Sequence, residues 1–316
     1  MPQTRLLAPD TEGIAAAADI LRAGGRVALP TETVYGLGAD ARSDAAVAGI
    51  FAAKDRPAFN PLIVHVADPT MAEALVVFPD AGRALARAFW PGPMTLVLPM
   101  RPGAGIAPLV TAGLSTLGVR VPTHPVAHAL LTAFGGPVAA PSANPSGRIS
   151  PTTAAHVMAG LLGRIEAVLD GGASPVGLES TIVGFDTEGR ARLLRPGGIS
   201  AEEIEAVLGA PLLAHAAEDG ITAPGQMLSH YAPSGTIRLN ATAARPGETL
   251  VGFGTVTGAL TLSAAGDLTE AAARLFAMFH QLDEMRAERI AIAPIPDEGL
   301  GVAINDRLRR AAAPRG

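Results

Sequence analysis

The sequence contains no cysteine, and only one of its 24 basic residues is a lysine, Lys54, so the other 23 are arginine. Without cysteine the chain has no disulfide, thiolate nucleophile, iron–sulfur cluster or cysteine-type zinc site. No run approaches the roughly 18 apolar residues that a membrane-spanning helix needs. The first ten residues also lack the apolar stretch of a secretory signal. These absences predict a soluble, cytoplasmic protein.

The common nucleotide-binding loops are also missing. A Walker A loop places a glycine directly before its lysine, whereas Lys54 follows Ala52-Ala53. The pair Gly36-Leu37-Gly38 lacks the third glycine of a dinucleotide-binding loop, and no Gly-x-Ser-x-Gly elbow is present. Any phosphate must therefore be held by a different arrangement.

The charge balance disfavours a dedicated nucleic-acid binder. The formal net charge is −5 at pH 7, whereas such proteins usually carry a basic excess. We expect the one basic concentration, near the C-terminus, to be solvated. It comprises Arg307, Arg309, Arg310 and Arg315. A weak local contact with RNA is left open.

Composition and periodicity predict two α/β domains. Hydrophobic residues make up 48% of the chain and charged residues 17%, which is typical of a globular protein with a large core. Strand and helix patterns alternate over residues 1–208, and residues 209–235 are aperiodic and rich in proline and glycine. Residues 236–316 alternate again, which predicts a smaller α/β domain after a linker.

The periodicity also predicts individual elements. Expected helices cover residues 12–23, 44–54, 69–77, 80–89, a stretch from 125, 153–162, 201–208 and 269–288. Expected strands cover residues 26–30, 62–66, 95–99, 117–121, 138–140, 167–169, 180–183, 192–194, 236–239, 249–254 and 290–293. Residues 31–40 read as a polar loop, with Tyr35 projecting into a site.

Lys54 and Arg56 lie at the predicted end of a helix, with Asn60 in the turn that follows. Two cations so close together could clamp a polyphosphate and stabilise charge that develops during a reaction. The alternative is that they only complement the helix C-terminus. His65, on the next strand, is a general base, a ligand contact or a structural histidine.

Other polar groups follow predicted strands, where ligand sites of α/β proteins form. The segment 30–38 brings Thr33, and the segment 139–147 brings Ser142 and Asn144. Arg120 lies inside a strand and needs an anion, for which a substrate carboxylate would serve. Further polar loops lie at 171–172, 179–181, 195–198 and 230–233. Pro125 separates His124 from His128, so no metal site is predicted there.

Together these motifs resemble the YrdC-like family in its two-domain form, the threonylcarbamoyl-adenylate synthases. The similarity lies in five segments that occur in the family's order, namely 30–38, 54–62, 142–144, 230–233 and 301–308. The resemblance implies an open, twisted α/β sheet with helices, followed by a smaller Rossmann-like domain. It also implies that L-threonine, bicarbonate and ATP give threonylcarbamoyl-AMP and pyrophosphate. A partner complex would then transfer the threonylcarbamoyl group to a tRNA adenosine beside the anticodon.

The resemblance assigns roles to single residues. Lys54 and Arg56 would be catalytic. Contacts to ATP would come from Arg56, Asn60, Thr116, Ser142, Asn144, Ser150, Arg195 and Tyr231. Contacts to threonine would come from Thr33, His65, Arg120, Ala140 and Ser180. Mg²⁺ would accompany ATP by bridging phosphates, with no dedicated protein ligands.

Tyr231 lies in the predicted linker, which suggests that the linker closes over ATP as a lid. Two other functions stay open at this point. One is an RNA-binding or ribosome-assembly factor without catalysis, and the other is an enzyme that adenylates carbamate for a different acceptor. The sequence does not define the oligomeric state or the group that deprotonates the threonine amine.

Overall fold

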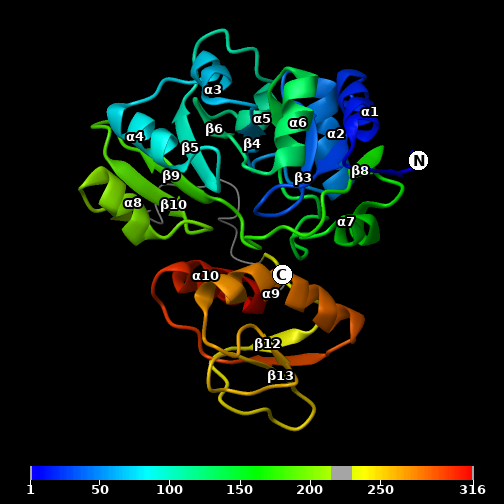
Figure 1. The fold of residues 1–316 in the computed structure, drawn as a ribbon, viewed down its shortest axis with the longest axis vertical. Coiled ribbons are helices and arrows are strands. Elements are labelled where there is room, and N and C mark those ends of the chain that lie inside the picture. Colours follow the sequence, from blue (N-terminus) through cyan, green and yellow to red (C-terminus); the bar gives the residue numbers. More distant parts are fainter. Residues whose placement is uncertain (1, 215–229, 315–316) are drawn as a thin grey trace.

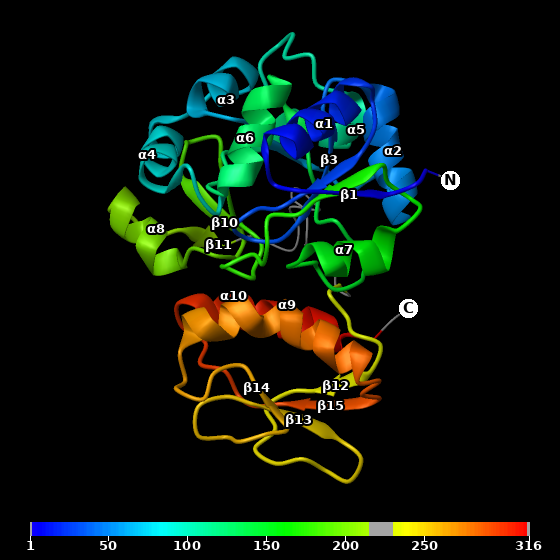
Figure 2. The same cartoon turned by 45° about the vertical axis from the view of Figure 1, so that its right-hand side comes forward.

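Two sheets of different size organise the chain in the computed structural model, which describes residues 2–214 and 230–314 (Figure 1). The first contains eleven strands and the second contains four. The helices α9 and α10 of the second unit lie between its own sheet and the first unit (Figures 1 and 2). This arrangement confirms the predicted α/β class with a smaller second unit.

The large sheet is mixed, with the strand order β1-β8-β2-β3-β7-β4-β6-β5-β9-β10-β11. Its strands are β1 (Arg5–Leu7), β2 (Val27–Leu29), β3 (Gly36–Asp40), β4 (Ile63–His65), β5 (Met94–Pro99), β6 (Thr116–Arg120), β7 (Val138–Ala139), β8 (Ala167–Leu169), β9 (Thr181–Phe185), β10 (Ala191–Arg195) and β11 (Leu213–Ala214). The parallel pair β4 and β6 places His65 directly opposite Arg120. The centre of this sheet therefore carries two of the predicted site residues.

Eight helices surround this sheet in the described residues. They are α1 (Thr11–Arg22), α2 (Asp44–Lys54), α3 (Pro69–Leu75), α4 (Asp80–Phe89), α5 (Pro108–Thr111), α6 (Pro125–Phe134), α7 (Ala154–Leu161) and α8 (Ala201–Leu208). Ser43 caps α2 and Ser200 forms a capping box on α8, as their positions before the helical pattern predict. The cap of α1 is Asp10, one residue earlier than Thr11, the N-cap that a helix over residues 12–23 would have.

The second unit has a fully parallel sheet of order β12-β15-β13-β14. Its strands are β12 (Thr236–Arg238), β13 (Thr249–Gly252), β14 (Leu260–Thr261) and β15 (Arg289–Ile292), and its helices are α9 (Leu268–Glu284) and α10 (Leu300–Ala312). Parallel strands joined through a helix are the Rossmann-like arrangement that the sequence resemblance implied. Phe276 and Phe279 of α9 fill its core together with Ile290 and Ile292 of β15.

Several elements were not predicted, namely β1, β3, α5, β11, β14 and α10. The strand β3 lies where a loop was expected, because its glycines hide the strand pattern. A side-chain carbon at Gly38 would lie 2.8 Å from Leu29 Cδ2 and 2.9 Å from Val138 Cγ1, so only glycine fits between the neighbouring strands.

The prediction that the C-terminal basic cluster is solvated was wrong for Arg307. This arginine lies on α10 and is fully buried, whereas Arg309 is exposed. Its helix presents Ala303, Ile304, Leu308 and Ala311 to the core on the same side. Arg307 thus occupies an apolar helix position, where it needs a buried anion.

The predicted linker, residues 209–235, is described only in part. Leu213–Ala214 add an edge strand to the large sheet, parallel to β10. Residues 215–229 lie outside the described residues, and the description resumes at His230. Across the described part of the chain, each helix is too short or too polar to cross a membrane.

Candidate functional site

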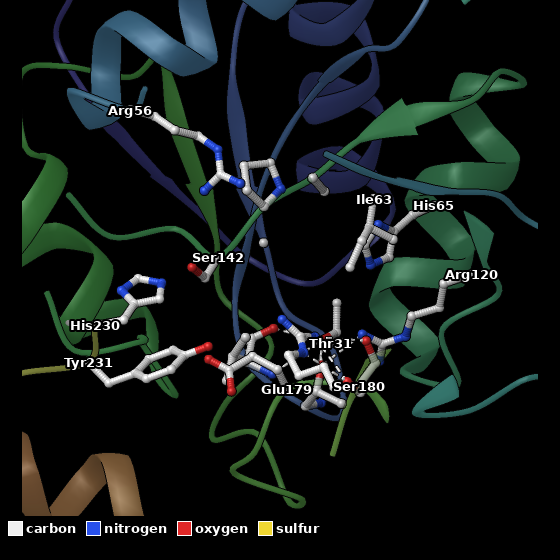
Figure 3. A pocket seen from close by; sticks show the side chains of 16 residues that line it. Thr31, Arg56, Ile63, His65, Arg120, Ser142, Glu179, Ser180, His230 and Tyr231 are labelled. Atoms are coloured by element: carbon white, nitrogen blue, oxygen red, sulfur yellow. Dashed lines mark hydrogen bonds between the residues drawn. The ribbon is translucent and has the colours of Figure 1, made fainter. Parts of the chain in front are cut away.

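A cavity opens at the centre of the large sheet, on the side of the second unit (Figure 3). It contains about 550 Å³ of empty space, part of it open to solvent. The described residues that line it come from segments far apart in the chain. They are Thr31, Thr33, Val34, Gly36, Arg56, Ile63, His65, Arg120, Ala140, Pro141, Ser142, Glu179, Ser180, Arg195, His230 and Tyr231.

The cavity has two ends that differ in how they are built. We call Thr33, His65, Arg120, Ala140 and Ser180 the strand end, because each lies within a strand or within four residues of one. We call Arg56, Arg195, His230 and Tyr231 the linker end, because both arginines lie near Tyr231, which with His230 comes from the predicted linker, although Arg195 is also the last residue of β10. Figure 3 shows His65 and Arg120 on one side of the cavity and His230 and Tyr231 on the other.

Arg120 is the most constrained residue of the strand end. Its Nη2 donates to Glu32 Oε1 at 2.5 Å, its Nη1 to Thr33 Oγ1 at 2.9 Å and its Nε to the Gly92 carbonyl at 3.2 Å. The side chains of Arg120 and Glu32 are each 4% exposed. Glu32 therefore supplies the anion that the sequence required. A guanidinium has five N–H groups, so one remains on each terminal nitrogen for a ligand.

His65 lies opposite Arg120 and is held neutral. Burial and the charge of Arg120 lower the pKa of its imidazole to about 3. Its buried Nδ1 has no hydrogen-bond partner among the described residues. A neutral ring with an unpartnered nitrogen in a cavity is suited to a polar ligand.

The hydroxyls of Thr31 and Thr33 are in contact at 2.8 Å, and Thr31 Oγ1 also donates to the Val34 carbonyl at 2.5 Å.

Tyr35 was predicted to project into a site, but it is not among the described residues that line the cavity. Its hydroxyl donates to the Gly172 carbonyl at 2.7 Å and accepts from the Gly171 N–H at 3.1 Å. Burial raises the pKa of this phenol to about 12. Tyr35 thus anchors the loop 171–172 against the sheet.

The linker end gathers two guanidinium groups. Arg56 donates to the Pro61 carbonyl at 3.0 Å, and burial lowers its pKa to about 10, with Arg195 adding a smaller repulsion. Arg195 donates to the carbonyl and the hydroxyl of Ser180, at 2.9 and 3.2 Å. Two cations with lowered pKa values in one cavity favour the binding of an anion between them.

Lys54 lies behind the cavity wall. Its ammonium donates to the carbonyl oxygens of Ser142 and Asn144, and burial lowers its pKa well below the ordinary value. Lys54 is therefore placed to hold the loop that carries Ser142, which does line the cavity. A catalytic role for Lys54 stays a prediction.

Four other predicted ATP contacts also lie outside the lining among the described residues. They are Asn60, Thr116, Asn144 and Ser150. Asn144 Nδ2 donates to the carbonyls of Pro145 and Arg148, at 2.9 Å each. Ser150 Oγ donates to Glu179 Oε1 at 2.6 Å. Asn144 and Ser150 thus support the cavity wall in this structure, and the contacts of all four residues to ATP stay predictions.

The second unit reaches the cavity through Arg307 and Glu179, neither of which was predicted as a site residue. Arg307 Nε donates to Glu179 Oε2 at 2.8 Å, and its Nη2 donates to the Pro196 carbonyl at 3.0 Å. The guanidinium also lies 5.1 Å from the centroid of the Tyr231 ring. The sequence signal that could have identified Arg307 is its position among the apolar residues of a helix.

His230 and Tyr231 form the wall opposite Arg120. Their rings stack with centroids 4.0 Å apart, and Tyr231 also packs 5.5 Å from the Phe276 ring of α9. The Tyr231 hydroxyl and His230 Nδ1 are buried without a hydrogen-bond partner among the described residues. Burial lowers the pKa of His230 to about 3 and raises that of Tyr231. Both groups are neutral and available to a ligand.

The fold and the cavity define a two-domain α/β protein whose cavity is lined by buried guanidinium groups and supported by both domains. Residues 19–197 match a family model described as "Telomere recombination", which covers Sua5, YciO and YrdC proteins. Residues 199–313 match the model "Threonylcarbamoyl-AMP synthase, C-terminal domain".

Similarity to known proteins covers nearly the whole chain. The threonylcarbamoyl-AMP synthase of Bacillus subtilis is 41% identical over 96% of this chain and 93% of its own, and that of Pyrococcus abyssi is 39% identical over 95% and 94%. The crystal structure of P. abyssi Sua5 complexed with L-threonine has a TM-score of 0.88 at 38% identity, covering 98% of this chain and 97% of that one. This chain therefore belongs to the threonylcarbamoyl-AMP synthase family, as its motifs indicated.

Proposed function

We propose that this chain makes L-threonylcarbamoyl-AMP and pyrophosphate from L-threonine, bicarbonate and ATP. The observation that carries the proposal is the cavity itself, which combines hydroxyl, imidazole and guanidinium groups at the strand end with two further guanidinium groups at the linker end. The names of the relatives and the threonine complex of the P. abyssi protein support the same reaction.

The strand end would bind threonine. The threonine carboxylate would accept hydrogen bonds from the remaining N–H groups of Arg120, because the planar guanidinium matches the geometry of a carboxylate. Thr33, His65 and Ser180 would contact the polar groups of the amino acid, together with the backbone of Ala140. The unpartnered Nδ1 of His65 supports this placement, because a ligand would satisfy it.

The linker end would bind the phosphates of ATP. The threonine amine first forms a bond to the carbon of bicarbonate with loss of water, and the resulting carbamate oxygen attacks the α-phosphorus as pyrophosphate leaves. Negative charge accumulates on both sides of this phosphorus, so fixed cations and donors matter more than a covalent nucleophile. Arg56 would act there directly, and Lys54 would contribute from behind the cavity wall by holding the loop that carries Ser142. The ATP contacts would be Arg56, Asn60, Thr116, Ser142, Asn144, Ser150, Arg195 and Tyr231.

We propose Mg²⁺ as the companion of ATP, held by phosphate oxygens. The cavity fits a cation that arrives with its own ligands. Glu179 is the one carboxylate in its described lining, and its two oxygens already accept from Ser150 and Arg307. Within residues 2–214 and 230–314, no three carboxylate or histidine side chains form a metal-binding group. Bound Mg²⁺ would neutralise phosphate charge.

The domain roles follow from this chemistry. Residues 1–208 would be catalytic, residues 209–235 would form a linker that closes over ATP as a lid, and residues 236–316 would buttress the site. The position of Tyr231 in the cavity wall and its packing on Phe276 support this division. The product would pass to a tRNA-modifying partner complex in the cytoplasm.

The test is pyrophosphate release from the purified protein with ATP, Mg²⁺ and bicarbonate, with and without L-threonine. We expect release that depends on threonine. Release without threonine would instead indicate carbamate adenylation for another acceptor. No release, together with salt-dependent binding of RNA, would favour a binding protein.

A further inference from the structure

Glu32 lies behind Arg120 as seen from the cavity. Its side chain is buried, and it is absent from the described cavity lining although both neighbours, Thr31 and Thr33, belong to it. Strand β2 ends at Leu29, and the chain bends at residues 32–34. Thr31 and Thr33 then face the cavity while Glu32 faces the protein.

The carboxylate of Glu32 is held from two directions. Oε1 accepts from Arg120 Nη2 at 2.5 Å, and Oε2 accepts from the Thr123 N–H at 3.2 Å. The Glu32 backbone is fixed as well, because its carbonyl accepts from the Val176 N–H at 2.8 Å. Glu32 thus cannot move away when a ligand approaches Arg120.

This arrangement has an electrostatic consequence. The buried pair of Glu32 and Arg120 is neutral overall before any ligand binds. A ligand carboxylate on Arg120 places a second anion beside the same cation, and the repulsion between the two anions is strong in a poorly solvated site. Arg120 therefore binds a carboxylate more weakly than an unpaired arginine would in the same position.

We infer that Glu32 is an internal counter-ion that orients Arg120 and limits how tightly the cavity holds an amino-acid carboxylate. This inference rests on the proposed function for the identity of the amino acid. Glu32 is a positioning residue, since it acts through Arg120. The adenylate product keeps the carboxylate of the amino acid, so the same repulsion speeds its release.

The test compares Glu32→Gln with the unaltered chain. Glutamine keeps an oxygen for Arg120 but removes the competing charge. Without ligand the variant should unfold at a lower temperature, because Arg120 loses its buried partner. Its dissociation constant for L-threonine should fall by about tenfold. KM for threonine and kcat should fall together, whereas a merely structural defect would raise KM.

Glu166→Gln is the matched control, because it removes the carboxylate of another ion pair, with Arg26, away from the cavity. Its threonine affinity should equal that of the unaltered chain. Equal or weaker threonine binding by Glu32→Gln would overturn the inference. If Glu32→Gln does not fold, Glu32→Asp replaces it, since the shorter side chain weakens the pair and should tighten threonine binding by about twofold to threefold. Unchanged or weaker binding by Glu32→Asp would likewise overturn it.

Acetate, used as a ligand in place of threonine, distinguishes a failure of this inference from a failure of the proposed function. If the unaltered chain does not bind threonine, the proposed function fails. The thermal shift caused by acetate then still decides the role of Glu32. Acetate should stabilise Glu32→Gln more than the unaltered chain, because it supplies the missing carboxylate. An equal shift in the two proteins would contradict the counter-ion role.

Discussion

The two ends of the cavity are built in different ways. At the strand end, His65 and Arg120 lie opposite each other on adjacent strands, and Arg120 already has three hydrogen bonds within the large domain. At the linker end, Tyr231 and His230 follow a segment outside the described residues, and each keeps a buried polar atom without a described partner. Tyr231 is supported by α9 of the second domain.

This difference implies that the strand end and the linker end bind their ligands in different ways. A group with its hydrogen bonds already formed is preorganised, so it binds its ligand with little rearrangement. His230 and Tyr231 carry their unpartnered atoms on the predicted linker and form these bonds only when the ligand arrives, which suits a closing lid, whereas His65 carries its unpartnered Nδ1 on a strand paired on both sides. We therefore expect the second domain to influence ATP more than threonine.

The largest expected effect is at the strand end. Arg120→Ala removes the proposed carboxylate contact and leaves Glu32 as an unpaired buried charge, which should cost about 3–5 kcal/mol of folding free energy. Threonine-dependent turnover should fall more than about a hundredfold. Adding Glu32→Ala to this variant should restore much of the stability, measured by denaturant unfolding, but not the turnover. Recovery of both would mean that Arg120 acts only in folding.

Arg307→Ala should remove the contacts that Arg307 of the second domain makes with Glu179 and the Tyr231 ring. Glu179 would lose its main cation and remain buried, so we expect about 3 kcal/mol of destabilisation. The affinity for ATP should fall more than the affinity for threonine, which titration calorimetry can compare. Arg309→Ala, on the exposed side of the same helix, is the control and should change neither. Equal losses for both ligands would contradict the proposed division.

Tyr231→Phe tests the hydroxyl of the linker end alone, because it removes one hydroxyl and keeps the ring packing on Phe276. KM for ATP should rise by about threefold to tenfold, the value of one hydrogen bond, while KM for threonine and the unfolding temperature stay constant. Steady-state kinetics with each substrate varied in turn measure this. Unchanged KM for ATP would remove Tyr231 from the ATP site.

The smallest expected effect concerns acid pH. His156 of α7 stacks on His280 of α9 at 3.7 Å, across the two domains. Burial and then the neighbouring His280 lower the pKa of His156 to about 4. The folded state thus binds fewer protons than the unfolded state, and stability falls as the pH drops from about 6.5 toward 4.

His280→Phe should reduce this pH dependence. Stacking would remain, but the repulsion on a protonated His156 and the lowered pKa of His280 itself would both be removed, so about 1 kcal/mol less stability should be lost between pH 7 and pH 5. His65 and His230 titrate in both proteins and cancel in the difference. Identical stability profiles of the two proteins from thermal unfolding would show that the stack is not the source.

Much of the fold could be predicted from local signals. Ser43 and Ser200 define the starts of α2 and α8 because an N-cap acts within one turn of the chain. By contrast β3 was missed, since its glycines fit contacts with β2 and β7 that the sequence does not reveal. The helix α10 was missed because its arginines suggested solvent, whereas Arg307 is paired with a residue 128 positions away.

The site could be predicted at the level of motifs but not of contacts. Thr33, His65, Arg120, Ala140 and Ser180 all line the cavity, because each lies at or near a strand of the same sheet. The partners of Arg120 and Lys54 could not be predicted, since Glu32 and the carbonyls of Ser142 and Asn144 are brought close only by tertiary folding.

The most direct test of the central claim is the mass of the nucleotide product formed from ¹³C-bicarbonate and ¹⁵N-threonine with ATP. We expect one adenylate that carries both labels, formed together with pyrophosphate. An adenylate that carries the carbon label without the nitrogen label would show that the cavity activates carbamate for a different acceptor, which would contradict the assignment of the strand end to threonine.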